Sequence, residues 1–312
     1  MLRKLTLAAL IAHACFSLAN AADKDTTHPF DRNTEDLTAG RGEPPMLGLH
    51  WTRELAGSHN ARPSSGSPLM TFHGGKIMPT AVTQTIFWGP SWASTSFAGD
   101  KITGLDSWYG GHSNSNYAHT TDEYTGTNGS VGAATSYLGH LIDPSTASDG
   151  KSTSAILAEV CKMVKSPDPS GNGYYAVYTD VKRGGAGYCA YHSAGTCGGY
   201  PVQFAFFFNL DGDSGCDPAD TSSKHSQGLA ALANVTGHEL EEARSDPASP
   251  GAWYDASGAE NGDKCAWTFG APFVTFSNGS QWKLQGEWSN AAYTAGTGYP
   301  NSSAQKGCLD GH

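Results

Sequence analysis

Apolar and polar positions alternate along the chain in patterns that predict several strands and two long helices. Residues 80–88 alternate between the two classes, which is typical of a half-buried strand. Residues 173–181 and 202–210 are continuous runs of β-branched and aromatic residues, as expected of strands that are buried on both faces. Residues 152–165 instead carry apolar side chains at helical spacing, behind a Ser/Thr start and ahead of basic residues. This pattern predicts an amphipathic helix.

The second helix, predicted over residues 226–245, carries apolar residues on two opposite sides, so both sides are expected to be buried. One side carries Leu229, Leu232, Leu240 and Ala243, and the other carries Ala231, Val235, His238 and Glu242. We therefore expect this helix to lie between a sheet and another layer of the protein. A histidine and a glutamate on a buried side need partners, because an unpaired buried carboxylate is costly. Beyond Pro247 the pattern predicts only turns and short strands.

The N-terminal part of the chain lacks this periodicity. A basic start, an apolar run and an Ala-Asn-Ala cleavage sequence predict a secretory signal peptide over residues 1–21. Residues 22–69 mix charges, Pro, Gly and Ser, and we expect a mobile N-terminal segment or pro-region there. Residues 70–312 are expected to form a single globular domain. A membrane anchor is the alternative for the first segment, but its apolar run is shorter than the roughly 20 residues that span a bilayer.

Composition restricts the class of partner. The chain has 312 residues, of which 38% are apolar and 15% charged, with 39 glycines, and this composition is typical of a globular protein with many turns. The formal net charge is −10, and loss of Arg3 and Lys4 with the signal peptide would make the mature chain more acidic still. We therefore expect no nucleic-acid partner, no membrane span and a secreted or extracellular location, or the periplasm in a bacterium.

Six cysteines remain once Cys15 leaves with the signal peptide, and an even set in an exported chain predicts up to three disulfides. The pairing that we predict joins Cys189 with Cys197, Cys265 with Cys308, and Cys161 with Cys216. A zinc site built of thiolates is the rival interpretation, but no CxxC pair supports it.

Candidate chemistry is concentrated in residues 233–247, which read ANVTGHELEEARSDP. Positions four apart lie on one face of a helix, so His238 and Glu242 can point at one ion while Glu239 sits beside them. This is the layout of HExxH zinc hydrolases, with Glu242 in the place of the second histidine. We predict a zinc site with Glu239 as general base.

The third zinc ligand must come from elsewhere in the chain. Asp263 and Glu260, in a loop that Cys265 could anchor, are the preferred candidates. Asp246 is the less favoured one, because Pro247 forces the chain out of the helix next to it. His192 or a nearby tyrosine is a candidate to stabilise an oxyanion.

Two simpler interpretations stand beside the zinc site. The acidic residues of the helix can be solvated, with His238 a core histidine. A second acidic cluster offers a weaker locus that would suit calcium, although Asp-Gly clusters are ordinary turns; it comprises Asp211, Asp213, Asp217 and Asp220, with His192 and His225 nearby. Residues 106–126 are rich in aromatic side chains, which either pack in the core or form a glycan-binding surface.

Several pieces of the chain, taken together, resemble the EXORDIUM or phosphate-induced family of plant extracellular proteins and its secreted bacterial relatives. They are FHGG before a strand ending in FWG, YTDV, GYCAYHS, GHELEEARSDP, AWYD, ENGDKC and WKLQGEW. The resemblance covers about residues 70–310. It implies an HExxE helix over residues 238–242, followed by Pro247 and by a segment with Glu260, Asp263 and Cys265. It implies Asn, rather than Asp246, in the plant members.

The resemblance implies export and a cell-wall or extracellular setting, and it brings no defined biochemical activity. From the residues we predict one α/β or α+β domain of the zincin type, in which a mixed sheet packs against the HExxE helix and disulfides stabilise the fold. The predicted function is a zinc-dependent hydrolase acting on peptide or protein substrates. The alternative is a non-catalytic extracellular protein that binds a cell-surface glycan or a receptor, with a structural metal or polar cluster.

Overall fold

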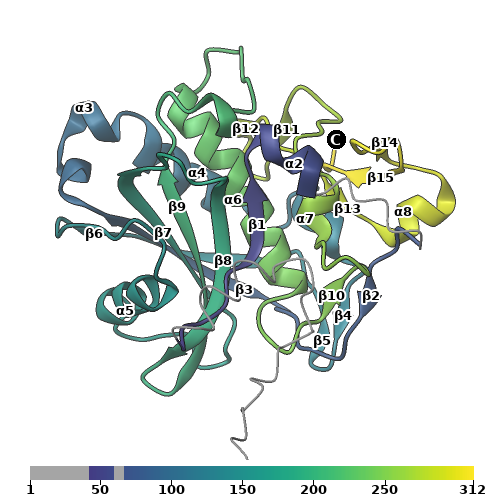
Figure 1. Cartoon of the computed structure of the whole chain (residues 1–312), viewed down its shortest axis with the longest axis horizontal. Coiled ribbons are helices and arrows are strands. Elements are labelled where there is room, and N and C mark those ends of the chain that lie inside the picture. Colours follow the sequence, from purple (N-terminus) through teal and green to yellow (C-terminus); the bar gives the residue numbers. More distant parts are fainter. Residues whose placement is uncertain (1–41, 60–66) are drawn as a thin grey trace, which may run out of the picture.

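A six-stranded mixed sheet forms the centre of the computed structural model, which describes residues 42–59 and 67–312 (Figure 1). In spatial order the strands are β1 (Leu47–Trp51), β8 (Tyr188–Cys197), β9 (Tyr200–Asn209), β7 (Gly173–Lys182), β3 (Ala81–Trp88) and β6 (Thr135–Asp143). Strands β9, β7, β3 and β6 run parallel to one another, whereas β8 is antiparallel to β9 and β1 is antiparallel to β8. The antiparallel pair therefore forms one edge of an otherwise parallel sheet.

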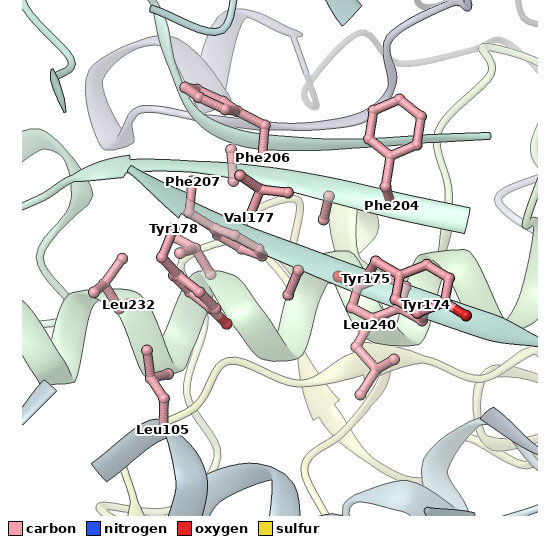
Figure 2. Packing of buried hydrophobic residues seen from close by; sticks show 14 of the residues in the cluster. Leu105, Tyr174, Tyr175, Val177, Tyr178, Phe204, Phe206, Phe207, Leu232 and Leu240 are labelled. Atoms are coloured by element: carbon pink, nitrogen blue, oxygen red, sulfur yellow. The ribbon is translucent and has the colours of Figure 1, made fainter. Parts of the chain in front are cut away.

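Helices cover both faces of this sheet. On one face lie α6 (Gln227–Ser245) and α4 (Lys101–His112), and on the other lies α5 (Thr153–Met163). Side chains along the strands alternate between the two faces of the sheet and so contribute to both hydrophobic layers. Phe204 and Phe206 point to one side, while Tyr178 points toward α6 and Leu105 of α4 (Figure 2). Ser152 and Ser226 cap α5 and α6, each accepting a hydrogen bond from a backbone N–H in the first turn.

Short elements complete the fold. The remaining strands pair as β2 (Thr71–Phe72) with β10 (Trp253–Tyr254), β4 (Thr125–Gly126) with β5 (Gly129–Ser130), β11 (Val274–Thr275) with β12 (Gln281–Trp282), and β13 (Glu287–Trp288) with β15 (Lys306–Leu309) and β14 (Tyr299–Pro300). The short helices are α2 (Arg53–His59), α3 (Thr95–Ala98), α7 (Asn261–Lys264) and α8 (Asn290–Ala295), with 3₁₀ turns at η1 (Pro90–Ala93), η2 (Ala118–Thr121) and η3 (Ser214–Cys216).

The prediction of a mixed α/β domain is confirmed at this level. The three predicted strands correspond to β3, β7 and β9, and the two predicted helices to α5 and α6. The glycine-rich region around residues 184–199 contains a full strand, β8, which was not predicted. Glycine is suited to that strand because a Cβ atom at Gly195 would lie 2.5 Å from the Leu157 side chain of α5.

The aromatic region at residues 106–126 is part of the core. Its first residues form the end of α4, and the Trp108, Tyr109, Tyr117 and Tyr124 side chains are buried. These four rings therefore offer no exposed platform for a glycan, and the core alternative is the correct one.

Three disulfides are present, and one of the three predicted pairings is correct. Cys265 bonds to Cys308, as predicted, but Cys161 bonds to Cys197 and Cys189 bonds to Cys216. The predicted bond between Cys189 and Cys197 is wrong because both residues lie in β8, at opposite ends. At about 3.3 Å per strand residue they are roughly 26 Å apart, far beyond the reach of a disulfide. Three disulfides are typical of a protein from an oxidising, extracellular compartment.

Regular structure is present before the expected domain boundary at residue 70. Residues 47–51 form β1 and residues 53–59 form α2, within the segment that was expected to be a mobile N-terminal segment or pro-region. Leu47 and Leu49 are buried against the domain, which explains why the strand forms despite the polar residues around it. The predicted signal peptide lies outside the described residues. Within residues 42–59 and 67–312, no helix combines the length and apolarity needed to cross a bilayer.

Candidate metal centre

Helix α6 places His238, Glu239 and Glu242 at the centre of the molecule. Every residue from Gly228 to Ser245 is buried, because the helix lies between the sheet and the C-terminal segments (Figure 1). The interpretation in which the acidic residues of this helix are solvated is therefore wrong. The four-residue spacing brings His238 Nε2 to 3.2 Å from Glu242 Oε2.

Two groups of side chains in the described residues bring metal-binding atoms within 4.8 Å of one another. The first is His238, Glu242 and Asp263, and the second is His192, Glu239 and Glu242. Glu242 belongs to both groups, so the two form one continuous cluster. His192 enters from β8, the strand next to the helix, and all of these side chains are buried.

The short helix α7 supplies the acidic residues from the C-terminal half. The Asp263 backbone N–H donates to Glu242 Oε1 at 2.9 Å, and Asp263 Oδ2 accepts from the Glu260 N–H at 3.2 Å. This leaves Asp263 Oδ1 on the side of His238 Nε2, at 3.8 Å. Glu260 Oε2 lies 3.4 Å from His192 Nε2. Close approach of α7 requires Gly262, where a Cβ atom would lie 2.7 Å from His238 Nδ1.

Asp246 lies outside both groups. It is the C-cap residue of α6, and its Oδ1 accepts a hydrogen bond from the Ala252 N–H at 2.5 Å. Its carboxylate therefore fixes the loop that follows Pro247.

Burial sets the protonation of the cluster. Desolvation lowers the pKa of His238 to about 3 and raises the pKa of Glu242 well above its ordinary value of 4.5. Desolvation, followed by the negative charge of Glu242, raises the pKa of Asp263 well above 3.8. Without a cation, burial therefore favours the neutral imidazole of His238 and the protonated carboxyl groups of Glu242 and Asp263. A divalent cation would displace those protons and compensate the negative charge.

A second layer of contacts orients His238. Gln285 Nε2 donates to His238 Nδ1 at 2.9 Å and to the Gly262 carbonyl at 3.0 Å. Gln285 Oε1 accepts from His50 Nε2 at 3.0 Å, and the His50 and His238 rings are 4.2 Å apart. With Nδ1 as acceptor, the proton of neutral His238 sits on Nε2 and faces Glu242. Metal binding at Nε2 requires the Gln285 amide to turn, so that its oxygen accepts from Nδ1.

The sequence did not predict a role for Gln285, His50 or Gly48. Gln285 lies in the WKLQGEW piece that contributed to the family resemblance, which was its only signal. His50 and Gly48 lie in the segment expected to be mobile. A Cβ atom at Gly48 would lie 2.1 Å from Glu242 Oε2 and 2.5 Å from His192 Nε2, so the main chain of β1 directly contacts the cluster.

The second acidic cluster proposed for calcium is held by other partners. Asp211 pairs with Lys101, and Arg183 Nε donates to Asp213 at 2.7 Å. None of these carboxylates belongs to either three-ligand group found in the described chain. Their side chains mainly fix turns and salt bridges, as expected of ordinary Asp-Gly loops.

Comparisons of the chain with protein-family models, curated proteins and solved structures gave no match. The functional assignment therefore has to come from the chemistry of the cluster itself. That cluster consists of two histidines and three carboxylates on α6, β8 and α7, all buried, with the Glu260 carboxylate beside His192.

Proposed function

We propose that the protein is a secreted, zinc-dependent hydrolase, with peptides as substrates and a zincin-like arrangement of the HExxE helix. The observation that carries this proposal is the convergence of His238 Nε2, Glu242 Oε2 and Asp263 Oδ1 in a buried space. The Nε2 and Oε2 atoms make no hydrogen bond of good geometry among the described residues. Buried polar atoms of this kind are normally satisfied, and a cation would satisfy both.

The residues present fit zinc. One histidine and two carboxylates, His238, Glu242 and Asp263, match the nitrogen and oxygen ligands that zinc takes in catalytic sites. Bound zinc would lower the pKa of a water molecule and polarise a substrate carbonyl.

Glu239 has the role of general base. It lies next to His238 in the sequence and in the second three-ligand group with His192 and Glu242. Its carboxylate would accept a proton from the attacking water and pass it to the departing amine, so that one peptide bond and one water give a carboxylate and an amine. His192 would lie close enough to the reacting carbonyl to donate a hydrogen bond to the developing oxyanion.

A second candidate function is favoured by one observation, the complete burial of the cluster. A site closed to solvent suits a structural metal or polar core in a non-catalytic extracellular protein of the EXORDIUM type, with a glycan or receptor as partner. The two candidates differ in what happens when Glu239 loses its charge. If the cluster is structural, Glu239→Gln can change only the stability of the protein. If the protein is a hydrolase, the same substitution lowers the cleavage rate.

The test combines zinc content with cleavage of a denatured protein substrate. We expect about one zinc per mature chain and cleavage that falls by at least about 10²-fold in Glu239→Gln while zinc is retained. Glu54→Gln, on the exposed face of α2, is the matched control and should change neither. Zinc far below one per chain after loading, or equal cleavage by wild type and Glu239→Gln once the site is opened as described below, would remove the hydrolase proposal. Zinc without cleavage, even after the site is opened as described below, would favour the structural candidate.

A further inference from the structure

The cluster of histidine and carboxylate side chains is covered by a strand from the N-terminal segment of the same chain. Strand β1 adds to the free edge of β8, antiparallel, with Leu47 opposite His192 and Trp51 opposite Tyr188. It also contacts α6 and α7. Figure 1 shows β1 beside β8 and in front of α6, next to α7. The edge of the sheet that borders the cluster is thus occupied by an extended piece of polypeptide.

The strand approaches the cluster through its main chain. The pairing of β1 with β8 is irregular between Leu47 and His50, where β1 has one residue more than its partner. Gly48 lies in this bulge with φ of 47°, a conformation that glycine adopts readily. Because any side chain here would meet Glu242 and His192, the bulge brings bare backbone against the two residues.

Most polar contacts that hold this segment involve its backbone carbonyl and amide groups. Ser193 Oγ donates to the Pro45 carbonyl at 2.6 Å, the Thr52 N–H donates to the Gly187 carbonyl at 2.9 Å, and Trp267 Nε1 donates to the Trp51 carbonyl at 2.9 Å. Recognition through the main chain of an added strand is how extended peptides bind to sheet edges. The side chains add buried anchors such as Leu47, Leu49 and His50, and the Glu43 carboxylate accepts hydrogen bonds from Thr153 Oγ1 and the Ser154 N–H at 3.4 Å.

No disulfide fixes the segment to the domain, since the three bonds of the described chain lie between Cys161 and Cys308. The segment is joined to the rest only through residues 60–66, whose sequence is NARPSSG. Its removal would break the β1–β8 pairing but none of the covalent cross-links.

We propose that the edge of β8 beside His192 is the binding site for an extended polypeptide, and that residues 43–52 occupy it in cis. The structure then describes a closed form, in which the chain's own strand keeps substrate from the cluster. The position of Gly48 indicates a preference for glycine, the smallest residue, at the point of the ligand that meets Glu242. This inference rests on the proposed function only in calling the bound polypeptide a substrate.

The test replaces residues 60–66 with the recognition sequence of a site-specific protease, cleaves the folded full-length protein, and separates the N-terminal fragment by gel filtration. Exposure of the cluster is read by diethyl pyrocarbonate modification of His192 and His238, located by mass spectrometry. We expect the fragment to leave a folded domain and the modification rate of both histidines to rise at least about tenfold. A synthetic peptide of residues 42–53 should restore protection, and the same peptide with Gly48→Val should not.

A pair of variants of the uncut chain keeps the proposal testable if the fragment stays bound. Gly48→Ala and Gly42→Ala both place a side chain at a positive φ, but only the first meets the cluster, because nothing lies within 4 Å of a Cβ atom at Gly42. We expect faster modification of His192 and His238 in Gly48→Ala alone.

Two results would overturn the proposal: histidines that stay protected after the fragment has gone, or a domain that unfolds with loss of the fragment in one transition. Neither readout involves metal or turnover, so the outcome is separate from that of the hydrolase test. An opened domain that binds the peptide but takes up no zinc would refute the hydrolase and leave the peptide-binding edge standing.

Discussion

Helix α6 carries two buried glutamates next to each other, Glu241 and Glu242, whose surroundings are opposite. Arg244 Nη1 donates to both oxygens of Glu241 at 2.7 and 2.5 Å, His112 Nε2 donates to it at 2.7 Å, and Thr121 Oγ1 at 2.8 Å. Glu242 instead faces His238 and the Asp263 backbone. Both side chains are fully buried, so exposure does not distinguish them.

Their charge states differ for this reason. Burial alone would raise the pKa of Glu241, but Arg244 and His112 together bring it below 4.5. Burial raises the pKa of Glu242 well above 4.5, and the single hydrogen bond from Asp263 offsets little of it. Glu241 is paired with a cationic side chain of the protein itself, Arg244, and we call it the framework glutamate. Glu242 lies beside a neutral histidine and another carboxyl group, so it is suited to binding an added cation. The contrast can be tested with isosteric substitutions one residue apart.

The largest expected effect is on the framework glutamate. Glu241→Gln removes the charge that compensates Arg244, which is also buried, and leaving one member of a buried ion pair costs about 3–5 kcal/mol. Urea unfolding should therefore show a loss of that size in the free energy of unfolding, with or without zinc. Glu54→Gln on α2 serves as control. A loss within about 0.5 kcal/mol, as exposed sites give, would show that the pair does not support the fold.

Zinc should have the next largest effect, and it should depend on Glu242. At a free zinc concentration about one hundred times its Kd, binding to the native state adds about 2.7 kcal/mol to the free energy of unfolding. Glu242→Gln removes a ligand of both three-ligand groups, so it should lose this gain, while Glu241→Gln should keep it. The measurement is thermal unfolding with zinc and with a chelator. An equal zinc effect in both variants would place the metal elsewhere.

The contrast between the two glutamates could be predicted only in part from the sequence. Helical spacing correctly places His238 and Glu242 on one face, and the Leu/Ala stripe correctly predicts burial. The partner of Glu241 is Arg244, one turn on, which local spacing also allows. The other side-chain contacts of Glu241 come from residues 120 or more positions away in the sequence, such as Thr121, whose Oγ1 donates to it. No local sequence pattern determines these contacts.

The strands show the same limit. The pattern of apolar and polar residues predicts β3 from its alternation and β7 and β9 from their unbroken apolar runs. Strand β8 contains glycines that allow packing against α5, so no such pattern predicts it. Because β8 was not predicted, neither the position of His192 nor the distance between Cys189 and Cys197 could be predicted. The role of Gly48 depends on a strand pairing with a sequence separation of more than 100 residues, which hydrophobic patterning does not encode.

A smaller effect is expected at Gln285, which sets the tautomer of His238. In Gln285→Glu a carboxylate accepts from His238 Nδ1–H, leaving the Nε2 lone pair toward Glu242 and Asp263. Carboxylate partners of this kind strengthen histidine ligands, and we expect zinc affinity to rise about tenfold, or about 1.4 kcal/mol. Competition with a chromophoric chelator measures this. Gln281→Glu, on β12, adds the same charge away from the cluster and should have little effect. Weaker or unchanged binding in Gln285→Glu would indicate that His238 does not bind zinc through Nε2.

The smallest and most specific effect is the pH dependence of the two glutamates in the metal-free protein. A carboxyl group whose pKa is raised by folding contributes stability below its ordinary pKa of 4.5, and this contribution is lost as the pH rises through the folded pKa. A group whose pKa is lowered contributes stability above 4.5, which is lost as the pH falls through its folded pKa. Glu242→Gln should therefore gain stability relative to the wild type as the pH rises above about 4.5.

Glu241→Gln should behave in the opposite sense, with a deficit that is greatest near neutral pH and shrinks in acid below 4.5. Urea unfolding of the three proteins in chelator, across this pH range, gives both difference curves in one experiment. Because the substitutions are isosteric and adjacent, general effects of pH on the fold cancel from the comparison. Parallel curves would mean that the two carboxyl groups share one environment, and the distinction between a framework glutamate and a metal-binding one would then fail. Curves that diverge would locate the need for a cation at Glu242.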